Sequence, residues 1–115
     1  MSKEYIQKIF INLGFNKTEI KIYFYLLKEG EKKARDIGKV MKLYKQQLYR
    51  SLKKMEKRNI IRSVGHPAHF SAVSFDNILD FVIKANLEEA KHIIQKKERL
   101  LSGWRSLKEK DFSDI

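Results

Sequence analysis

The first thirty residues carry two runs of apolar residues with helical spacing. The first run predicts an amphipathic helix that ends at Gly14. Its members are Ile6, Ile9, Phe10 and Leu13. The second run begins after Asn16, which is suited to cap a helix, and Glu19 three positions later completes a capping-box pair. Apolar residues surround most of this second helix before Gly30 ends it, so we expect it at the centre of the core.

Two further helices are predicted next, separated only by Lys42 and Leu43. The third covers residues 34–41, and the residues expected to face inward are Ile37, Val40 and Met41. The fourth covers residues 44–58, with a buried stripe formed by Leu48, Leu52 and Met55 at i, i+4 and i+7. We expect Asn59 to adopt the left-handed backbone conformation and to end this helix. This close pairing of helices is typical of a helix-turn-helix.

A short hairpin is predicted after the fourth helix. Residues 60–64 and 69–73 have strand character, and the turn between them consists of Gly65, His66, Pro67 and Ala68. Three helices followed by a hairpin is the order of a winged helix-turn-helix. We therefore predict a mainly α fold with a small β-hairpin wing over residues 1–75.

The remaining residues, 76–115, predict a long helix that Ser74 is suited to cap. A helix of about 35 residues would extend roughly 50 Å at ~1.5 Å per residue, which is longer than a domain of this size can cover. We therefore predict a dimerisation helix that forms an antiparallel or bundled pair with a second copy. The pair is coiled-coil-like without a strict heptad, because Lys97 interrupts the stripe and Gly103 weakens the helix. The alternative is a helix folded back on its own domain. The predicted dimerisation residues are Leu87, Ala90, Ile93, Ile94, Leu100, Leu101, Trp104 and Leu107.

The amino-acid composition indicates whether the chain can fold and in which cellular compartment it is expected. With 43% hydrophobic residues in 115, the chain has enough apolar side chains for one small core and is not expected to be disordered. It has no cysteine, which excludes disulfides, thiolate metal ligands and a thiol nucleophile, and fits an intracellular protein. No apolar segment is long enough to span a bilayer. We expect a cytoplasmic protein with no membrane partner and no cofactor.

The net charge of +11 lies entirely in residues 1–75, because residues 76–115 carry equal numbers of basic and acidic residues. Between Lys32 and Arg62 there are 12 basic residues against only Asp36 and Glu56. Such a dense cluster of positive charges indicates a polyanionic partner, and nucleic acid is the leading class. The alternatives are a solvated lysine-rich surface and an anionic membrane surface.

The fourth predicted helix supplies the candidate base-reading residues Gln46, Gln47 and Arg50. They lie near its start, away from the buried stripe, and glutamine and arginine can bond adenine and guanine bidentately in the major groove. Cations and one tyrosine around them are candidate phosphate contacts, which hold the protein on DNA without reading sequence. These are Lys33, Lys42, Tyr44, Lys45, Lys53, Lys54, Lys57 and Arg62.

The predicted wing contains His66, Pro67 and His69. Two histidines three residues apart suggest a metal site, but no cysteine or neighbouring acidic residue completes one, so we predict no metal site. A pH-sensitive wing is the other hypothesis, since histidine gains charge near its usual pKa of ~6.5 and a charged wing would bind phosphate more strongly.

Several stretches resemble the TrmB family of archaeal and bacterial regulators. Residues 13–27, Leu-Gly-Phe-Asn-Lys-Thr-Glu-Ile-Lys-Ile-Tyr-Phe-Tyr-Leu-Leu, are similar to the family's opening, and residues 48–61 are similar to its recognition helix and first wing strand. Further matching positions are Ala34, Ile37, Lys39, Gly65, Pro67, Phe70, Ala72 and Val73. The resemblance covers residues 10–80. Departures are Tyr44, where the family often has proline, and a wing poor in basic residues.

The resemblance implies a dimeric DNA-binding transcriptional regulator whose recognition helix enters the major groove. Many members also carry a C-terminal sugar-binding domain; 115 residues leave no room for one, and the sequence does not distinguish a minimal relative from the DNA-binding half of a longer protein. We find no motif of a catalytic site and expect no enzyme. Two alternatives remain: a non-specific architectural DNA-binding protein, and a winged-helix protein-interaction module.

Overall fold

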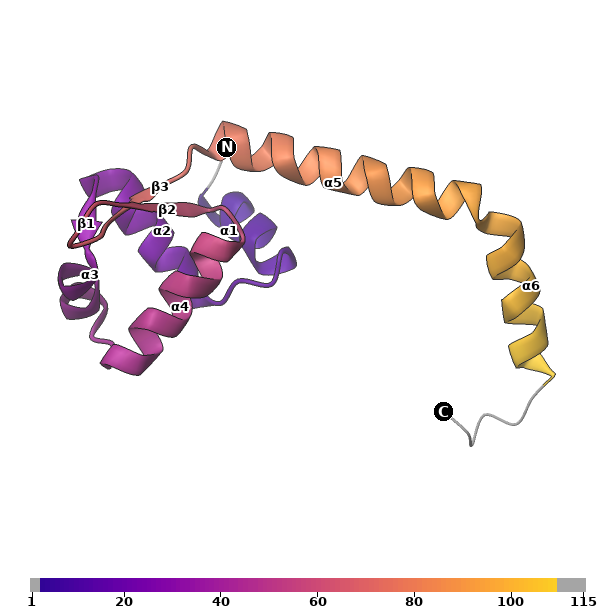
Figure 1. Cartoon of the computed structure of the whole chain (residues 1–115), viewed down its shortest axis with the longest axis horizontal. Helices are drawn as coiled ribbons and strands as arrows, with labels where there is room; N and C mark the ends of the chain where they lie inside the picture. The colour runs from indigo at the N-terminus through magenta and orange to yellow at the C-terminus, as the bar shows by residue number, and fades with distance from the viewer. Residues whose placement is uncertain (1–2, 110–115) are drawn as a thin grey trace. The chain divides into compact units, whose positions relative to one another are not determined.

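The computed structural model describes residues 3–109, so residues 1–2 and 110–115 at the ends of the two predicted segments lie outside the described residues. The chain divides into two compact units, Met1–Ile78 and Leu79–Ile115. Figure 1 labels the elements, which are α1 (Lys3–Asn12), α2 (Lys17–Glu29), β1 (Lys32–Lys33), α3 (Ala34–Met41), α4 (Lys45–Lys57), β2 (Ile61–Val64), β3 (His69–Ala72), α5 (Phe75–Gln95) and α6 (Lys97–Lys108). The predicted mainly helical fold with a winged helix-turn-helix is confirmed.

The predicted capping box at the start of α2 is present. The Asn16 side chain accepts a hydrogen bond from the Glu19 N–H (2.8 Å), and the Glu19 carboxylate accepts one from the Asn16 N–H (2.9 Å). Together they satisfy two N–H groups that a helix start would otherwise leave unpaired. Gly30 ends α2 at φ 84°, a conformation that residues with a Cβ rarely adopt.

Aromatic rings from three helices form the centre of the first unit. Phe10 of α1 packs against Tyr23 of α2 (ring centroids 4.9 Å apart) and against Phe75 at the start of α5 (5.8 Å). The Tyr23 hydroxyl donates to the carbonyl of Val73 (2.7 Å), and burial raises the pKa of Tyr23 to about 12. Ile78 is also buried, so the first turn of α5 belongs to this core.

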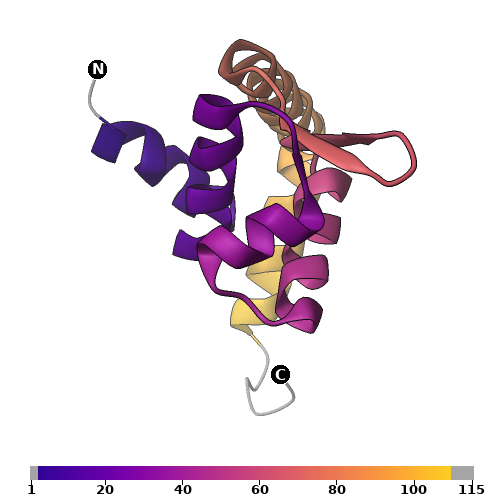
Figure 2. The ribbon, with the colours of Figure 1, turned by 90° about the vertical axis from the view of Figure 1, so that its left-hand side faces the viewer.

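The sheet has three antiparallel strands in the order β1-β3-β2, where the sequence predicted only a hairpin. β2 and β3 form that hairpin, which extends past the helices of its unit (Figure 2). β1 adds an edge strand through the pairs Lys32 with Phe70 and Lys33 with His69. Two consecutive lysines carry no alternation of apolar and polar residues, so their strand is set by tertiary pairing alone.

Helix α3 has the predicted bounds, but its buried face is different. Ala34, Ile37 and Gly38 are buried, whereas Val40 is 54% exposed, so the prediction that Val40 faces inward is wrong. The reason is the close approach of α4 at Gly38, where an added Cβ would lie only 2.9 Å from a methyl group of Leu48. Because Gly38 has no side chain, α4 can approach this side of α3 closely, and this side therefore faces the core.

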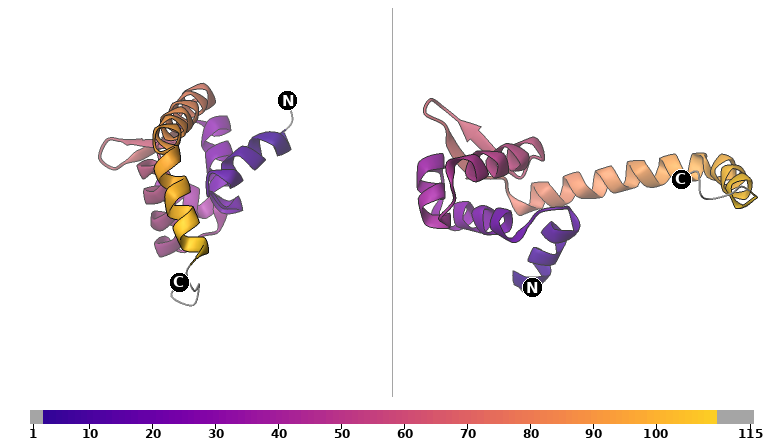
Figure 3. Two further views of the ribbon diagram at one scale, coloured as in Figure 1. Left: turned by 90° about the vertical axis from the view of Figure 1, so that its right-hand side faces the viewer. Right: turned by 90° about the horizontal axis from the view of Figure 1, so that it is seen from below.

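The predicted single C-terminal helix is two helices, with Lys96 between them at φ −102° and ψ 8°. Its N–H bonds to the carbonyls of both His92 and Ile93 (3.2 Å each), which ends the regular ladder of α5. Both views of Figure 3 show α6 running in a different direction from α5. No glycine or proline marks the break, but Lys97, which interrupts the apolar stripe, directly follows it. Within the described residues, no helix is long and apolar enough to cross a membrane.

Candidate nucleic-acid interface

Helix α4 is held by one apolar face. Leu48, Leu52 and Met55 are buried as predicted, and the Leu48 N–H closes the first turn by donating to the carbonyl of Tyr44 (2.9 Å). Tyr44 is the N-cap and makes no side-chain capping bond. Its ring is 82% exposed, which is the highest exposure among the large hydrophobic residues of the described chain. The stripe fixes which faces of α4 remain outward.

The C-terminal end of α4 is closed by a Schellman motif. Asn59 adopts the predicted left-handed conformation (φ 61°), which confirms it as the stop. Its N–H donates to Glu56 and the Ile60 N–H donates to Met55, both at 3.1 Å. Met55 and Ile60 are both buried, which supplies the apolar contact that accompanies this motif. Helix α4 therefore has a fixed end from which the chain turns into β2.

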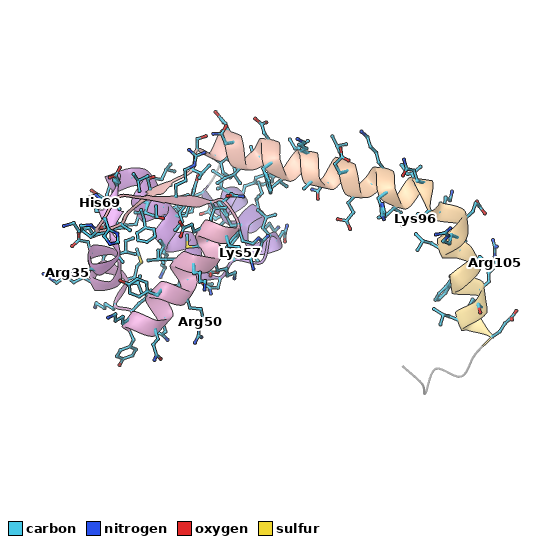
Figure 4. The ribbon with its side chains drawn as sticks, viewed as in Figure 1. Arg35, Arg50, Lys57, His69, Lys96 and Arg105 are labelled. Atoms are coloured by element: carbon cyan, nitrogen blue, oxygen red, sulfur yellow. The ribbon has the colours of Figure 1, made fainter. Side chains whose placement is uncertain are left out.

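The three candidate base-reading residues lie on the exposed surface of α4. Gln46, Gln47 and Arg50 occupy its first two turns, and all three are exposed. Figure 4 shows Arg50 and Lys57 projecting from α4. The helix end that carries Arg50 is therefore free to approach a ligand, which is the geometry required for reading base edges in a groove.

A hollow of about 400 Å³ lies between α3 and α4. Arg35 and Lys39 line it from α3, and Lys45 and Tyr49 line it from α4, over a floor that includes Leu43 and Leu48. Arg35 and Lys39 are not among the contacts predicted from the sequence. Their spacing of four residues on one helix, which places both on the same face, was the signal that could have found them.

A second, smaller hollow of about 220 Å³ lies between α4 and the start of α2. Gln47, Arg50 and Ser51 line it from α4, and Thr18 lines it from the first turn of α2. Two of the three candidate base-reading side chains thus share one concave surface with polar groups of another helix. Thr18 was also not selected from the sequence.

The C-terminal half of α4 carries a basic hollow of about 580 Å³. Five basic residues line it: Arg50, Lys53, Lys54, Lys57 and Arg58. Lys53, Lys57 and Arg58 are exposed. Three further predicted phosphate contacts are exposed on other elements of this unit: Lys33 in β1, Lys42 at the left-handed C-cap of α3 (φ 55°), and Arg62 in β2.

Lys54 differs from its neighbours because it has partners within the chain. Its ammonium donates to the Glu19 carboxylate and to the Gly14 carbonyl, both at 2.9 Å. Glu19 is only 2% exposed, and the Phe15 ring lies under both Lys54 (5.3 Å) and Arg58 (4.8 Å). These contacts join α4 to the connection between α1 and α2, so Lys54 helps to hold α4 in position.

The wing is exposed at its turn and paired at its base. His66, Pro67 and Val64 are exposed, with Gly65 at φ 87° between them. On β2, the Ser63 hydroxyl donates to the Glu56 carboxylate, which ties the hairpin to the end of α4.

His69 lies on β3, and its Nδ1 is 3.1 Å from a carboxylate oxygen of Glu31. No acidic residue neighbours the two histidines in the sequence, and Glu31, which is distant in sequence, is brought beside His69 by β1. Residues 3–109 contain no group of three or more His, Cys, Asp or Glu side chains arranged to hold a metal ion.

The predicted dimerisation residues belong to the second unit, and nearly all of them are exposed. Leu101 is half-buried, while Ile94 is 71% exposed, the highest value of the set. Helix α6 has no buried residue. Such a run of exposed large apolar side chains is typical of a surface that another chain covers.

Three solved structures share the fold, each at 20% sequence identity or less. A protein from the thermoacidophilic archaeon Sulfolobus tokodaii is 20% identical with a TM-score of 0.60, over 83% of this chain and 96% of that chain. A possible transcriptional regulator from Methanosarcina mazei is 18% identical with a TM-score of 0.61, over 79% of this chain and 83% of that chain. A MarR-like transcriptional regulator from Thermotoga maritima is 17% identical with a TM-score of 0.50, over 95% of this chain and 96% of that chain.

The family model described as the sugar-specific transcriptional regulator TrmB matches residues 10–76, which is more than half of the chain. No curated protein matches significantly. The matched range contains α2, the helix-turn-helix and the wing, in agreement with the resemblance read from the sequence. This winged-helix chain therefore belongs to the TrmB family of transcriptional regulators.

Proposed function

We propose that the chain binds double-stranded DNA sequence-specifically as a homodimer and places α4 in the major groove, as a transcriptional regulator acting in the cytoplasm on the nucleoid. One observation carries the proposal: the first two turns of α4 expose Gln46, Gln47 and Arg50 together. The major groove admits an α-helix, a glutamine amide matches the edge of adenine, and a guanidinium matches the edge of guanine. These side chains are the base-reading group of the proposal.

The basic residues beside α4 support binding to the DNA backbone. Arg35, Lys39 and Lys45 line the hollow toward α3, and Lys53 and Lys57 extend along α4 itself. A helix in the major groove lies between two phosphate strands, so cations on and beside that helix are candidates for phosphate contacts. Lys33, Lys42, Tyr44 and Arg62 remain proposed contacts of the same kind, and Lys54 is assigned to positioning α4.

The exposed apolar residues of α5 and α6 support the homodimer. A chain whose second unit buries almost none of its apolar surface gains stability when a second copy covers it. Two copies related by a two-fold axis would read a site with two-fold symmetry.

The test is in-vitro selection of random duplex DNA at near-physiological salt, where non-specific phosphate binding is suppressed. We expect enrichment of a two-fold-symmetric motif by the natural chain and no enrichment by the Gln46→Ala/Arg50→Ala variant. The matched control is Asn12→Ala/Lys28→Ala, which removes one amide and one cation from exposed positions of α1 and α2. It should recover the same motif as the natural chain.

A second candidate is an architectural DNA-binding protein, which the length of the basic surface favours. The cations continue past the base-reading group to Lys57 and Arg58 at the end of α4. A folded protein that binds duplex DNA tightly and salt-dependently without enriching any motif would replace sequence-specific regulation with this function. A folded protein that binds no duplex DNA would overturn both.

A further inference from the structure

The fold of the first unit makes little use of the Tyr44 side chain. Tyr44 is the N-cap of α4, a position that favours serine, threonine, aspartate and asparagine because their side chains bond a free N–H of the first turn. Tyr44 makes no such bond, and among the described residues its ring has no hydrogen bond, ion pair or aromatic partner. The main chain alone supports the helix start, since the Tyr44 carbonyl accepts from the Leu48 N–H. A residue that breaks a local preference without a gain in packing indicates a role outside the fold.

The ring of Tyr44 lacks an apolar partner at the end of α4 that carries the base-reading group. An aromatic ring as exposed as this one gains free energy when another apolar group covers it. Tyr44 directly precedes the first turn of α4, which exposes Gln46 and Gln47. Whatever this end of α4 approaches therefore also meets the ring.

Two lysines flank Tyr44 along the chain. Lys42 is exposed at the C-cap of α3, and Lys45 is exposed at the first position of α4. Cations this close favour a polyanion over an apolar protein surface as the partner of the segment. The partner of the ring is therefore sought among the apolar groups of nucleic acid.

The major groove of duplex DNA offers one apolar group on its base edges, which is the C5 methyl group of thymine. A phosphate accepts a hydrogen bond from the phenol hydroxyl and leaves the ring in water. Stacking on a base requires a base that has left the paired stack, which an intact duplex does not present. The thymine methyl group is thus the partner that matches an exposed tyrosine ring.

We infer that Tyr44 is a specificity-determining residue whose ring packs on the C5 methyl group of a thymine, next to the bases bound by the base-reading group. The inference rests on the proposed function and adds a base contact to it. A backbone contact of Tyr44 involves only its hydroxyl, so the two contacts are separable. Each half-site is therefore expected to contain one thymine whose methyl group, and not only its base pairing, contributes to binding.

Deoxyuridine tests the methyl group directly, because it pairs like thymidine and lacks only that group. Duplexes carrying the selected motif are prepared with each thymine of one half-site replaced singly by deoxyuridine, and dissociation constants are measured by fluorescence anisotropy. For the natural chain, one replacement should raise the dissociation constant about fourfold, the effect of one methyl group that is no longer buried. Tyr44→Phe keeps the ring and should show the same dependence, whereas Tyr44→Ala should bind the thymine and deoxyuridine duplexes equally.

Tyr49→Ala is the matched control, because it removes the other exposed tyrosine of α4 and should keep the methyl dependence. Tight binding of a motif that tolerates every deoxyuridine, or a dependence that survives in Tyr44→Ala, overturns the inference and leaves sequence-specific binding intact. Loss of the dependence in Tyr44→Phe assigns the effect to the hydroxyl and also overturns it. If no motif is enriched, the inference falls together with the proposed function.

A serine at the N-cap separates recognition from folding. Tyr44→Ser supplies the capping oxygen that α4 lacks, so it should leave Tm unchanged or raise it by up to about 8 °C, while the methyl dependence is lost. Thermal unfolding followed by circular dichroism measures the first effect, and the deoxyuridine duplexes measure the second. A lower Tm for Tyr44→Ser would show that the ring supports the fold, and would overturn the inference.

Discussion

The two units of this chain use similar apolar residues in opposite ways. In the first unit, residues such as Phe10, Ile37 and Leu52 are buried by other elements of the same chain. In the second, Leu87 and Trp104 are more than half exposed, although they follow an equally regular helical pattern. The pattern of apolar residues therefore identifies helices in both units, and only the number of elements available to pack together separates a buried core from an exposed apolar surface.

The largest expected effect contrasts two leucines. Leu52→Ala in α4 should lower the free energy of unfolding by about 2–5 kcal/mol, because it removes buried methyl groups and leaves a cavity. Leu87→Ala in α5 should change the stability of the dilute monomer by less than about 0.5 kcal/mol. Urea unfolding at several protein concentrations measures both. Equal losses from the two variants at low concentration would mean that the second unit has a core of its own.

The next prediction compares the two units by the effect of an arginine substitution on DNA affinity. Arg50→Ala should cost about 1–3 kcal/mol of binding to a selected site and relax the base preference at one position, because it removes the proposed bidentate contact. Arg105→Ala removes the same side chain from an exposed position of α6, and its effect should be small. Fluorescence anisotropy with the selected duplex and with single-base variants measures both. A larger loss from Arg105→Ala would move the DNA contact to the second unit.

A smaller effect concerns the attachment of α4. Glu19→Ala should destabilise the first unit by about 1–2 kcal/mol, because the Asn16 N–H and the Lys54 ammonium both lose an ionised partner. Glu98→Ala in α6 removes an exposed glutamate and serves as the control. Thermal unfolding followed by circular dichroism provides the comparison. If Glu19→Ala is as harmless as Glu98→Ala, the ion pair does not hold α4 in place.

The smallest effect is the loss of one buried hydroxyl. Tyr23→Phe should cost about 1 kcal/mol, because the carbonyl of Val73 loses its donor. The folded state favours the neutral phenol, so the stabilisation from Tyr23 is complete below about pH 10 and is lost as the pH rises toward its folded pKa of about 12. Urea unfolding at pH 8 and pH 11 should therefore show a smaller difference between natural chain and variant at pH 11. Tyr25→Phe on the same helix is the control, and a constant difference would contradict the assignment.

Local signals in the sequence were sufficient for most of the first unit. The capping box of Asn16 and Glu19, the bounds of α3 and the stop at Asn59 depend on residues a few positions apart, and all three are present. The buried stripe of α4 was predictable for the same reason. With the stripe known, the outward positions of Gln46 and Arg50 follow from the helical repeat alone.

Features that depend on distant partners could not be predicted. Lys54 has the same sequence character as Lys53, yet it binds Glu19, which is 35 positions away. The strand at Lys32 and the neighbour of His69 likewise depend on the return of β3. Whether a lysine is free for phosphate is thus decided by packing rather than by its place in a basic run.

The pairing of Lys32 with Phe70 has a consequence for the order of folding. This pair encloses α3, α4 and the first wing strand, so β1 has no partner until all of them have been synthesised. Helices form from local contacts, whereas closing a loop of this length costs more chain entropy before any contact repays it. We therefore expect the helix-turn-helix to form first, and the amide hydrogens of β1 to be the last in this unit to gain protection during refolding.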